Sequence, residues 1–147
     1  MAKYIRITKE FDFEMAHALD FHDGKCRNIH GHSYKLAVTL KGIPKENKTS
    51  DAGMVMDFGD LKKIVKSLIV DQLDHALVLE ENSPYLTDNI KKQTQKLVLV
   101  DYQPTCENML LDFKDRLKNV LPKDVELLHL KLRETATGYA EWFSEDN

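Results

Sequence analysis

Residues 4–17 read YIRITKEFDFEMAH, and apolar and polar side chains alternate along nearly all of this stretch. Successive side chains of a β-strand point to opposite faces of a sheet, so this pattern predicts a strand with one buried face. The apolar phase is made of Ile5, Ile7, Phe11, Phe13 and Met15, and only Lys9 interrupts it. The next position in the same phase is His17, which the strand therefore places on its buried face.

A second strand is predicted in residues 30–41, HGHSYKLAVTLK, where the alternation returns. His30 and His32 lie two residues apart, so both imidazoles leave the same face of this strand. The same phase continues through Tyr34, Leu36, Val38 and Leu40. The intervening residues 18–29 are rich in turn formers, and a loop of this kind favours antiparallel pairing of the two strands. Such pairing brings His17 beside the other two histidines.

The rest of the sequence predicts an α+β architecture with an antiparallel sheet. Helical spacing of apolar residues begins at Phe58, with Asp57 or Asp60 near the helix N-terminus, and Thr105 is the expected N-cap of a second amphipathic helix. The predicted elements after residue 41 are, in order, a short strand at 54–58, a helix from 58 to about 74, a loop or short helix at 80–95, a strand at 96–102, a helix at 105–121 that ends before Pro122, and two strands at 125–135 and 139–143.

Length and composition limit the classes of protein to which the chain can belong. Its 147 residues fit one domain, 1–147, and 42% hydrophobic residues are enough to form a buried core. The formal net charge of −3 gives no support for binding to nucleic acid or to an anionic membrane surface. We see no signal-peptide pattern and no apolar run near the ~20 residues of a membrane span. With only two cysteines, Cys26 and Cys106, the chain is expected to be a cytoplasmic protein with free thiols.

The three histidines that the two strands bring together predict a metal site. His17, His30 and His32 would supply three imidazoles, the protein ligand number of a catalytic zinc ion whose fourth position takes water or substrate. A His-x-His pair on a strand is more often not a metal site, but a third histidine in phase favours zinc. The alternative is a non-catalytic protein with a structural zinc, which needs a fourth protein ligand, and Cys26 is the nearby candidate.

Further candidates for catalysis are Cys26 and the pair Asp74–His75. Cys26 is either a small apolar residue in a polar loop or a base or nucleophile whose thiolate is favoured by the metal and by the charges of Lys25 and Arg27. Asp74 and His75 stand at the expected end of the first helix. They are either solvated helix-terminal residues or a carboxylate–imidazole unit that relays a proton near neutral pH.

Two glutamates are candidates for substrate binding. Glu134 shares the phase of Leu128, Leu130 and Leu132, and a carboxylate at the end of an apolar strand face is costly unless it has a partner. A ligand with N–H donors, such as the edge of a guanidine-like heterocycle, would be such a partner. Glu107 lies at the N-terminus of the second predicted helix, where a carboxylate is favoured in any case.

Five motifs contain these residues in a specific order. They are FEMAHAL with His17, CRNIHGH, LDHALVL, PTCEN and LRETATGYAEW. Together they resemble the motifs of the 6-pyruvoyl-tetrahydropterin synthase and 6-carboxy-tetrahydropterin synthase family, and the resemblance runs from about residue 5 to residue 143. The resemblance implies a T-fold, in which an antiparallel four-stranded sheet packs on two antiparallel helices. It also implies a homo-oligomer, a trimer whose strands close a barrel or a hexamer of two trimers, with active sites between subunits.

The resemblance further implies a zinc-dependent lyase that acts on 7,8-dihydroneopterin triphosphate. The roles that it implies are zinc binding by His17, His30 and His32, proton abstraction by Cys26, proton relay by Asp74 and His75, and binding of the pterin's amino-pyrimidine edge by Glu134 with support from Glu107 and Thr105. The expected product is 6-carboxy-5,6,7,8-tetrahydropterin, released with acetaldehyde and triphosphate in queuosine and 7-deazapurine biosynthesis. The alternative is a 6-pyruvoyl-tetrahydropterin synthase, which eliminates triphosphate only. Residues 80–100 are longer than expected for compact members, so this insertion would affect substrate choice if it reached the pocket.

Overall fold

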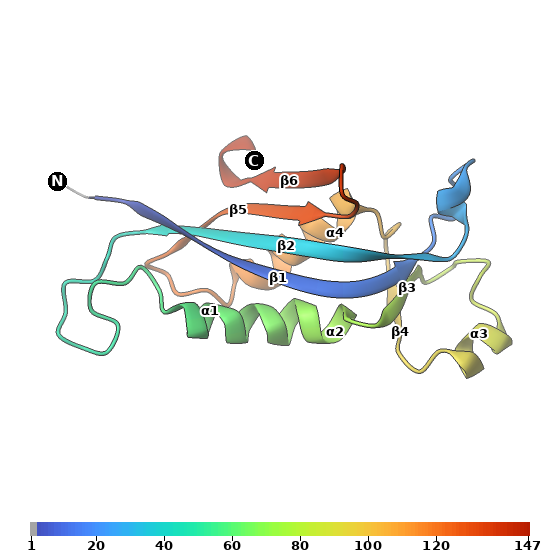
Figure 1. Ribbon diagram of the computed structural model, residues 1–147, viewed down its shortest axis with the longest axis horizontal. Helices are drawn as coiled ribbons and strands as arrows, with labels where there is room; N and C mark the ends of the chain where they lie inside the picture. The colour runs from blue at the N-terminus through green and yellow to red at the C-terminus, as the bar shows by residue number, and fades with distance from the viewer. Residues whose placement is uncertain (1–2) are drawn as a thin grey trace.

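The computed structural model describes residues 3–147, which form one curved sheet with helices against it (Figure 1). The strands are β1 (Ile5–His17), β2 (His30–Gly42), β3 (Ala76–Glu80), β4 (Leu97–Val100), β5 (Glu126–Arg133) and β6 (Tyr139–Phe143). The α-helices are α1 (Phe58–Val65), α2 (Asp71–Leu73), α3 (Asp88–Gln93) and α4 (Cys106–Lys118). The remaining short segments are η1 (Lys25–Arg27), the π-helical η2 (Lys66–Val70) and η3 (Ser144–Asp146).

The strands form a six-stranded sheet in the order β4-β3-β1-β2-β5-β6. β1 and β2 pair antiparallel along their whole length, from Ile5 opposite Gly42 to His17 opposite His30. β5 and β6 continue the antiparallel part, whereas β3 and β4 join the other edge in parallel. The predicted four-stranded antiparallel sheet is therefore confirmed in β1, β2, β5 and β6, and two short parallel strands extend it.

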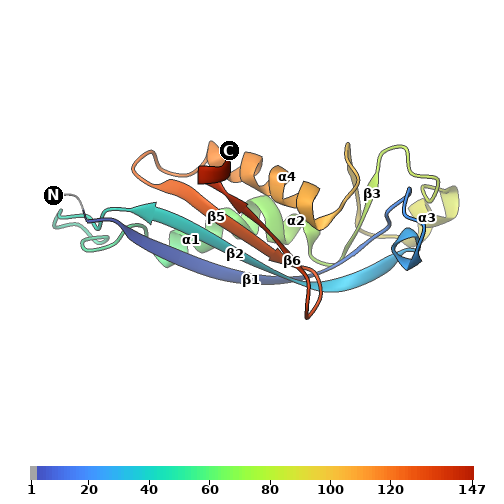
Figure 2. The same cartoon turned by 90° about the horizontal axis from the view of Figure 1, so that it is seen from above.

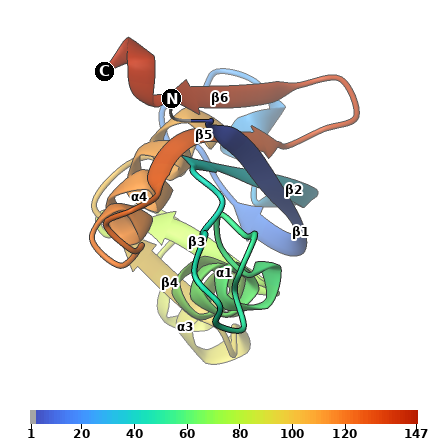
Figure 3. The same cartoon turned by 90° about the vertical axis from the view of Figure 1, so that its left-hand side faces the viewer.

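Two helical segments cover one face of the sheet and run in opposite directions (Figures 2 and 3). α1, η2 and α2 follow one another over residues 58–73, and the Asp57 carboxylate caps them by accepting from two backbone N–H groups at the start of α1. The Thr105 hydroxyl caps α4 by accepting from the N–H of Asn108. None of the helices in residues 3–147 is long and apolar enough to cross a membrane. The fully buried side chains between sheet and helices include Phe13, Tyr34, Leu36, Leu61, Ile69 and Phe113.

The predicted strand at 54–58 is wrong. Val55 and Met56 are buried, but the segment leads directly into α1 and pairs with none of the strands in residues 3–147. β3 is absent from the predicted elements because its first four residues are all buried and show no alternation. The segment 80–95 does contain a short helix, α3, and β4 lies within the strand predicted at 96–102. α4 ends at Lys118, before its predicted end.

Candidate metal centre

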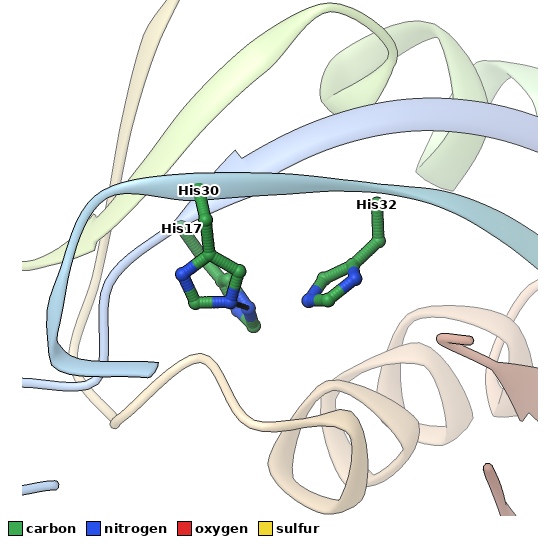
Figure 4. Close-up of side chains that lie close together, drawn as sticks. All are labelled: His17, His30 and His32. Atoms are coloured by element: carbon green, nitrogen blue, oxygen red, sulfur yellow. Dashed lines mark hydrogen bonds between the residues drawn. The ribbon is translucent and has the colours of Figure 1, made fainter. Parts of the chain in front are cut away.

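Three histidines converge where β1 ends and β2 begins (Figure 4). His17 lies directly opposite His30 in the β1–β2 register, and His32 lies opposite Met15. The ring centroids are 4.7 Å apart for His17 and His30, 4.8 Å for His30 and His32, and 5.2 Å for His17 and His32. One nitrogen from each ring lies within 4.8 Å of the others, so these three side chains could hold one metal ion.

Hydrogen bonds to backbone carbonyls fix the tautomers of two of these rings. Nδ1 of His17 donates to the Pro104 carbonyl at 2.7 Å, and Nδ1 of His30 donates to the Asn28 carbonyl at 2.6 Å, since a carbonyl oxygen can only accept. In the neutral rings both lone pairs are then on Nε2, and these two Nε2 atoms are 3.1 Å apart. Nε2 of His32 is buried and has no hydrogen-bond partner in residues 3–147. The site therefore directs unpartnered nitrogen lone pairs at one small region, which fits a bound cation.

Burial favours the metal-binding form of two rings in this cluster, those of His17 and His32. It is the main cause that lowers the pKa of both His17 and His32 from the usual 6.5. The Glu134 carboxylate raises the pKa of both rings, and the Pro104 carbonyl raises that of His17, but neither outweighs burial. Neutral imidazole is the form that coordinates a metal ion. Both rings are therefore neutral and available near pH 7.

Glu134, which follows β5, lies beside the histidines. Its Oε1 atom is 3.6 Å from Nε2 of both His17 and His32, and the buried Tyr34 hydroxyl donates to the same oxygen at 3.4 Å. Burial and then the Glu134 charge raise the pKa of Tyr34 above its usual 10, so the hydroxyl stays protonated as a donor. The carboxylate thus has one protein donor, the Tyr34 hydroxyl, which partly meets the need for a partner at its place on an apolar strand face.

A hydrogen-bond network behind the cluster holds Pro104 in place. The Gln103 side chain accepts from the Asp20 N–H at 3.0 Å and donates to the Asp20 carboxylate at 3.4 Å. It also donates to the carboxylate of Glu80, at the end of β3. Gln103 therefore ties the loop before α4 to the segments that follow β1 and β3. The next carbonyl along that loop, that of Pro104, receives the Nδ1 proton of His17.

Cys26 lies outside the three-histidine cluster. It is half-buried in η1, and its carbonyl accepts from the Leu19 N–H at 3.0 Å. Within residues 3–147, no cysteine or carboxylate joins the group of three close ligand atoms. Cys26 and Cys106 are both free thiols. Cys26 is thus close to His30 in the sequence, but its sulfur is not part of the group of candidate metal ligands.

Asp74 and His75 form the turn between α2 and β3, with Asp74 Oδ2 3.1 Å from His75 Nδ1. His75 lines a cavity of about 330 Å³ over β1 and β2. The other residues that line it include Glu14, Gly31, Ser33 and the metal-ligand candidate His32. Hydrogen bonds to the backbone of Glu14 in β1 anchor the pair. Within residues 3–147, neither Asp74 nor His75 makes a hydrogen bond or ion pair with His17, His30 or His32.

Glu107 and Thr105 lie at the start of α4, close to Glu134. Both glutamates line a cavity of about 360 Å³ between α4 and the β5–β6 turn. The Thr105 hydroxyl is used as the N-cap of α4, so it supports the shape of this cavity. Burial raises the pKa of the Cys106 thiol to about 12, and its Sγ donates to the Leu132 carbonyl at 3.1 Å. Cys106 is thus a buried thiol that packs against β5.

Some supporting residues give little or no signal in the sequence. Tyr34 shares the apolar phase of β2 and reads there as a core residue, although its place two residues after His32 puts it on the histidine face. Gln103 and Pro104 lie in a loop, and their contacts depend on the path of the backbone. No sequence pattern indicates which backbone carbonyl will bind a distant imidazole, so these contacts could be found only in the structure.

Comparison with known proteins agrees with this geometry. A family model described as 6-pyruvoyl tetrahydropterin synthase matches residues 6–145. A 6-carboxy-5,6,7,8-tetrahydropterin synthase of Haemophilus influenzae is 39% identical over 140 residues, covering 93% of this chain and 97% of that protein. The protein of the same name from Synechocystis sp. is 34% identical over 139 residues, covering 94% of this chain and 92% of its own.

Solved structures share the fold. An uncharacterized protein of Wolinella succinogenes is similar with a TM-score of 0.80 at 20% identity, over 97% of this chain and 99% of that one. The 6-pyruvoyl tetrahydropterin synthase of Caenorhabditis elegans is similar with a TM-score of 0.66 at 26% identity, over 97% of each chain. The fold that the sequence motifs imply is therefore confirmed.

Proposed function

Because the chain belongs to the 6-pyruvoyl tetrahydropterin synthase family, we propose that it is a zinc-dependent 6-carboxy-5,6,7,8-tetrahydropterin synthase. It would convert 7,8-dihydroneopterin triphosphate to 6-carboxytetrahydropterin, acetaldehyde and triphosphate, in the cytoplasm and in the service of queuosine and 7-deazapurine biosynthesis. The 6-carboxy product is favoured over the 6-pyruvoyl product because relatives at 39% and 34% identity carry the 6-carboxy name.

The arrangement of the histidine Nε2 atoms is the observation that carries this proposal. Nε2 of His17 and Nε2 of His30 face each other at 3.1 Å with both protons held on Nδ1, and Nε2 of His32 is buried without a partner in the described chain. Three neutral imidazoles suit Zn²⁺, which in catalytic sites takes three protein ligands and keeps a fourth position open. Bound Zn²⁺ supplies the Lewis acidity that makes protons beside the substrate's side-chain oxygens easier to remove.

The chain's own residues hold the substrate and move its protons. Cys26, as a thiolate, removes a proton from the substrate side chain, and the Asp74–His75 pair carries a proton to or from the reacting atoms. Glu134 accepts from the N–H groups on the amino-pyrimidine edge of the pterin. Support for this role comes from the position of Glu134 between the histidines and the cavity that it shares with Glu107.

We also propose that the complete active site is shared between subunits of a trimer or hexamer. The His75 side chain is 76% exposed, and within residues 3–147 its pair with Asp74 makes no hydrogen bond or ion pair with the histidines of the same chain. β1 pairs with β3 only at Met15, Ala16 and His17, which leaves most of that edge open, and β6 is the other edge of the sheet. Pairing of such edges between copies would give hydrogen-bond partners to the open backbone groups. It would also bring the Asp74–His75 pair of one copy toward the metal of another.

Product analysis tests the proposed reaction. The zinc-loaded protein is incubated with 7,8-dihydroneopterin triphosphate, and the products are identified by mass spectrometry. Acetaldehyde together with a 6-carboxy pterin supports the proposal, whereas a 6-pyruvoyl product alone assigns the chain to the other activity of the family. Failure of the zinc-loaded protein to consume the substrate contradicts both. The control is His32→Ala, which should bind no zinc and form neither product.

A further inference from the structure

The backbone at His75 is held in an unfavourable conformation. Its φ is +63°, and His75 is the one residue other than glycine with a positive φ among residues 3–147. Side chains of L-residues crowd the backbone in this left-handed region, so the conformation persists only where surrounding contacts impose it. This strain lies at one member of the pair to which we assign the proton relay.

Contacts with β1 hold one side of the turn. The N–H of Glu14 donates to Asp74 Oδ1 at 2.9 Å, and the N–H of His75 donates to the Glu14 carbonyl at 2.5 Å. The first of these bonds is the main cause that lowers the pKa of Asp74 from its usual value. The Asp74 carboxylate is therefore ionised beside the His75 imidazole, 3.1 Å from its Nδ1 atom.

Lys96 holds the other side of the turn. Its Nζ atom donates to the carbonyls of Asp71 and Asp74, each at 2.7 Å. A helix leaves its last carbonyls without partners, and a charged donor makes stronger bonds to them than a neutral one. The Lys96 carbonyl in turn accepts from the Leu77 N–H at 3.0 Å, so the backbone of Lys96 is fixed against β3.

We propose that Lys96 is a positioning residue, which holds the Asp74–His75 turn in its left-handed conformation and so sets the direction of the His75 imidazole. This inference rests on the proposed function, in which that pair relays a proton. Lys96 belongs to the segment 80–100, which we expect to be longer than in compact members of the family. The segment would thus contribute to turnover by shaping the turn, without touching the substrate.

Kinetics of Lys96 variants test this role. Lys96→Met keeps most of the length of the side chain but removes the donors, and kcat should fall about tenfold while the KM for 7,8-dihydroneopterin triphosphate and the zinc content stay unchanged. Exchange of the His75 amide hydrogen should become faster, because its bond to Glu14 opens more often. Lys96→Arg keeps a cationic donor and should recover most of kcat. The matched control is Lys92→Met, which changes an exposed lysine of α3 and should alter none of these values.

A double-mutant cycle separates positioning from general stabilisation. If Lys96 acts through His75, Lys96→Met lowers kcat in the original chain but not further in His75→Ala. If Lys96→Met lowers kcat equally in both backgrounds, Lys96 does not act through His75. If His75→Ala loses turnover but Lys96→Met does not, Lys96 has no role in positioning. Either result overturns the role of Lys96 and leaves the relay standing. Unchanged turnover in His75→Ala overturns the relay and the role of Lys96 with it. If Lys96→Met does not fold, Lys96→Gln, which keeps two N–H donors without the charge, replaces it in the cycle.

Discussion

Replacement of Gln103 by methionine should weaken zinc binding although Gln103 touches none of the metal-binding nitrogens. Its side chain bonds to the Asp20 N–H at 3.0 Å and to the carboxylates of Asp20 and Glu80. Methionine has nearly the same length but cannot make these bonds. The two carboxylates would then repel each other without a shared donor, and the loop that carries Pro104 would lose its attachment.

The size of the effect follows from the bond between Pro104 and His17. Loss of a partner that orients a metal-ligating histidine usually lowers metal affinity by about 10–100-fold. The lower end applies here because the β1–β2 register keeps the His17 backbone opposite His30 even if Pro104 moves. We therefore expect the zinc dissociation constant of Gln103→Met to rise about tenfold, which corresponds to about 1.4 kcal/mol.

Competition with a chromogenic zinc chelator measures this dissociation constant for the metal-free protein. Gln95→Met is the matched control, because Gln95 is exposed and lies outside the network. Denaturant unfolding should show that both variants are folded in water, with a lower midpoint for Gln103→Met because it loses these hydrogen bonds. A zinc dissociation constant for Gln103→Met equal to that of the native chain would refute the reasoning that Pro104 orients His17 through this network.

Three other results are expected. Cys26→Ala should keep one zinc per chain by metal analysis but lose turnover, and loss of the metal would show that the thiol is a ligand. Burial lowers the pKa of His17 and His32, so the unfolded chain binds more protons than the folded chain below about pH 6.5. The metal-free protein should therefore lose stability to urea as the pH falls through about 6.5 and retain its stability above that pH. A free energy of unfolding that does not change with pH would contradict this. Thr105→Ala removes the cap bond to the Asn108 N–H and should lower the free energy of unfolding by about 1 kcal/mol in the same assay, whereas an unchanged value would mean that the cap adds nothing.

Alternation in two strands was enough to predict where the three histidines meet. In a strand, the direction of a side chain depends on its phase alone, so the apolar residues from Phe11 to Met15 fix the face of His17. Tight pairing of β1 and β2 then places His30 opposite it. The helix starts could be predicted for a similar reason, because Asp57 and Thr105 act locally on N–H groups two or three residues away.

Features that depend on distant parts of the chain could not be predicted in this way. Burial of Val55 and Met56 resembles that of a strand, yet their segment pairs with no strand of the described chain. β3 is buried without alternation because both of its faces are covered: Ala76 and Val78 belong to the main core, whereas Leu77 and Leu79 pack in a second cluster with Tyr85, Leu86 and Ile90. The separation of His75 from the histidine cluster likewise follows from how α2 returns to the edge of β1, which no local pattern contains.

X-ray absorption at the zinc edge tests the open three-histidine zinc site, since it reports the atoms bound to the metal in the loaded protein. We predict three imidazole nitrogens at about 2.0–2.1 Å and one oxygen from water, with no sulfur bound to the zinc. A sulfur ligand at about 2.3 Å would place Cys26 on the metal and close the site. That result would contradict an open catalytic centre and favour a structural zinc.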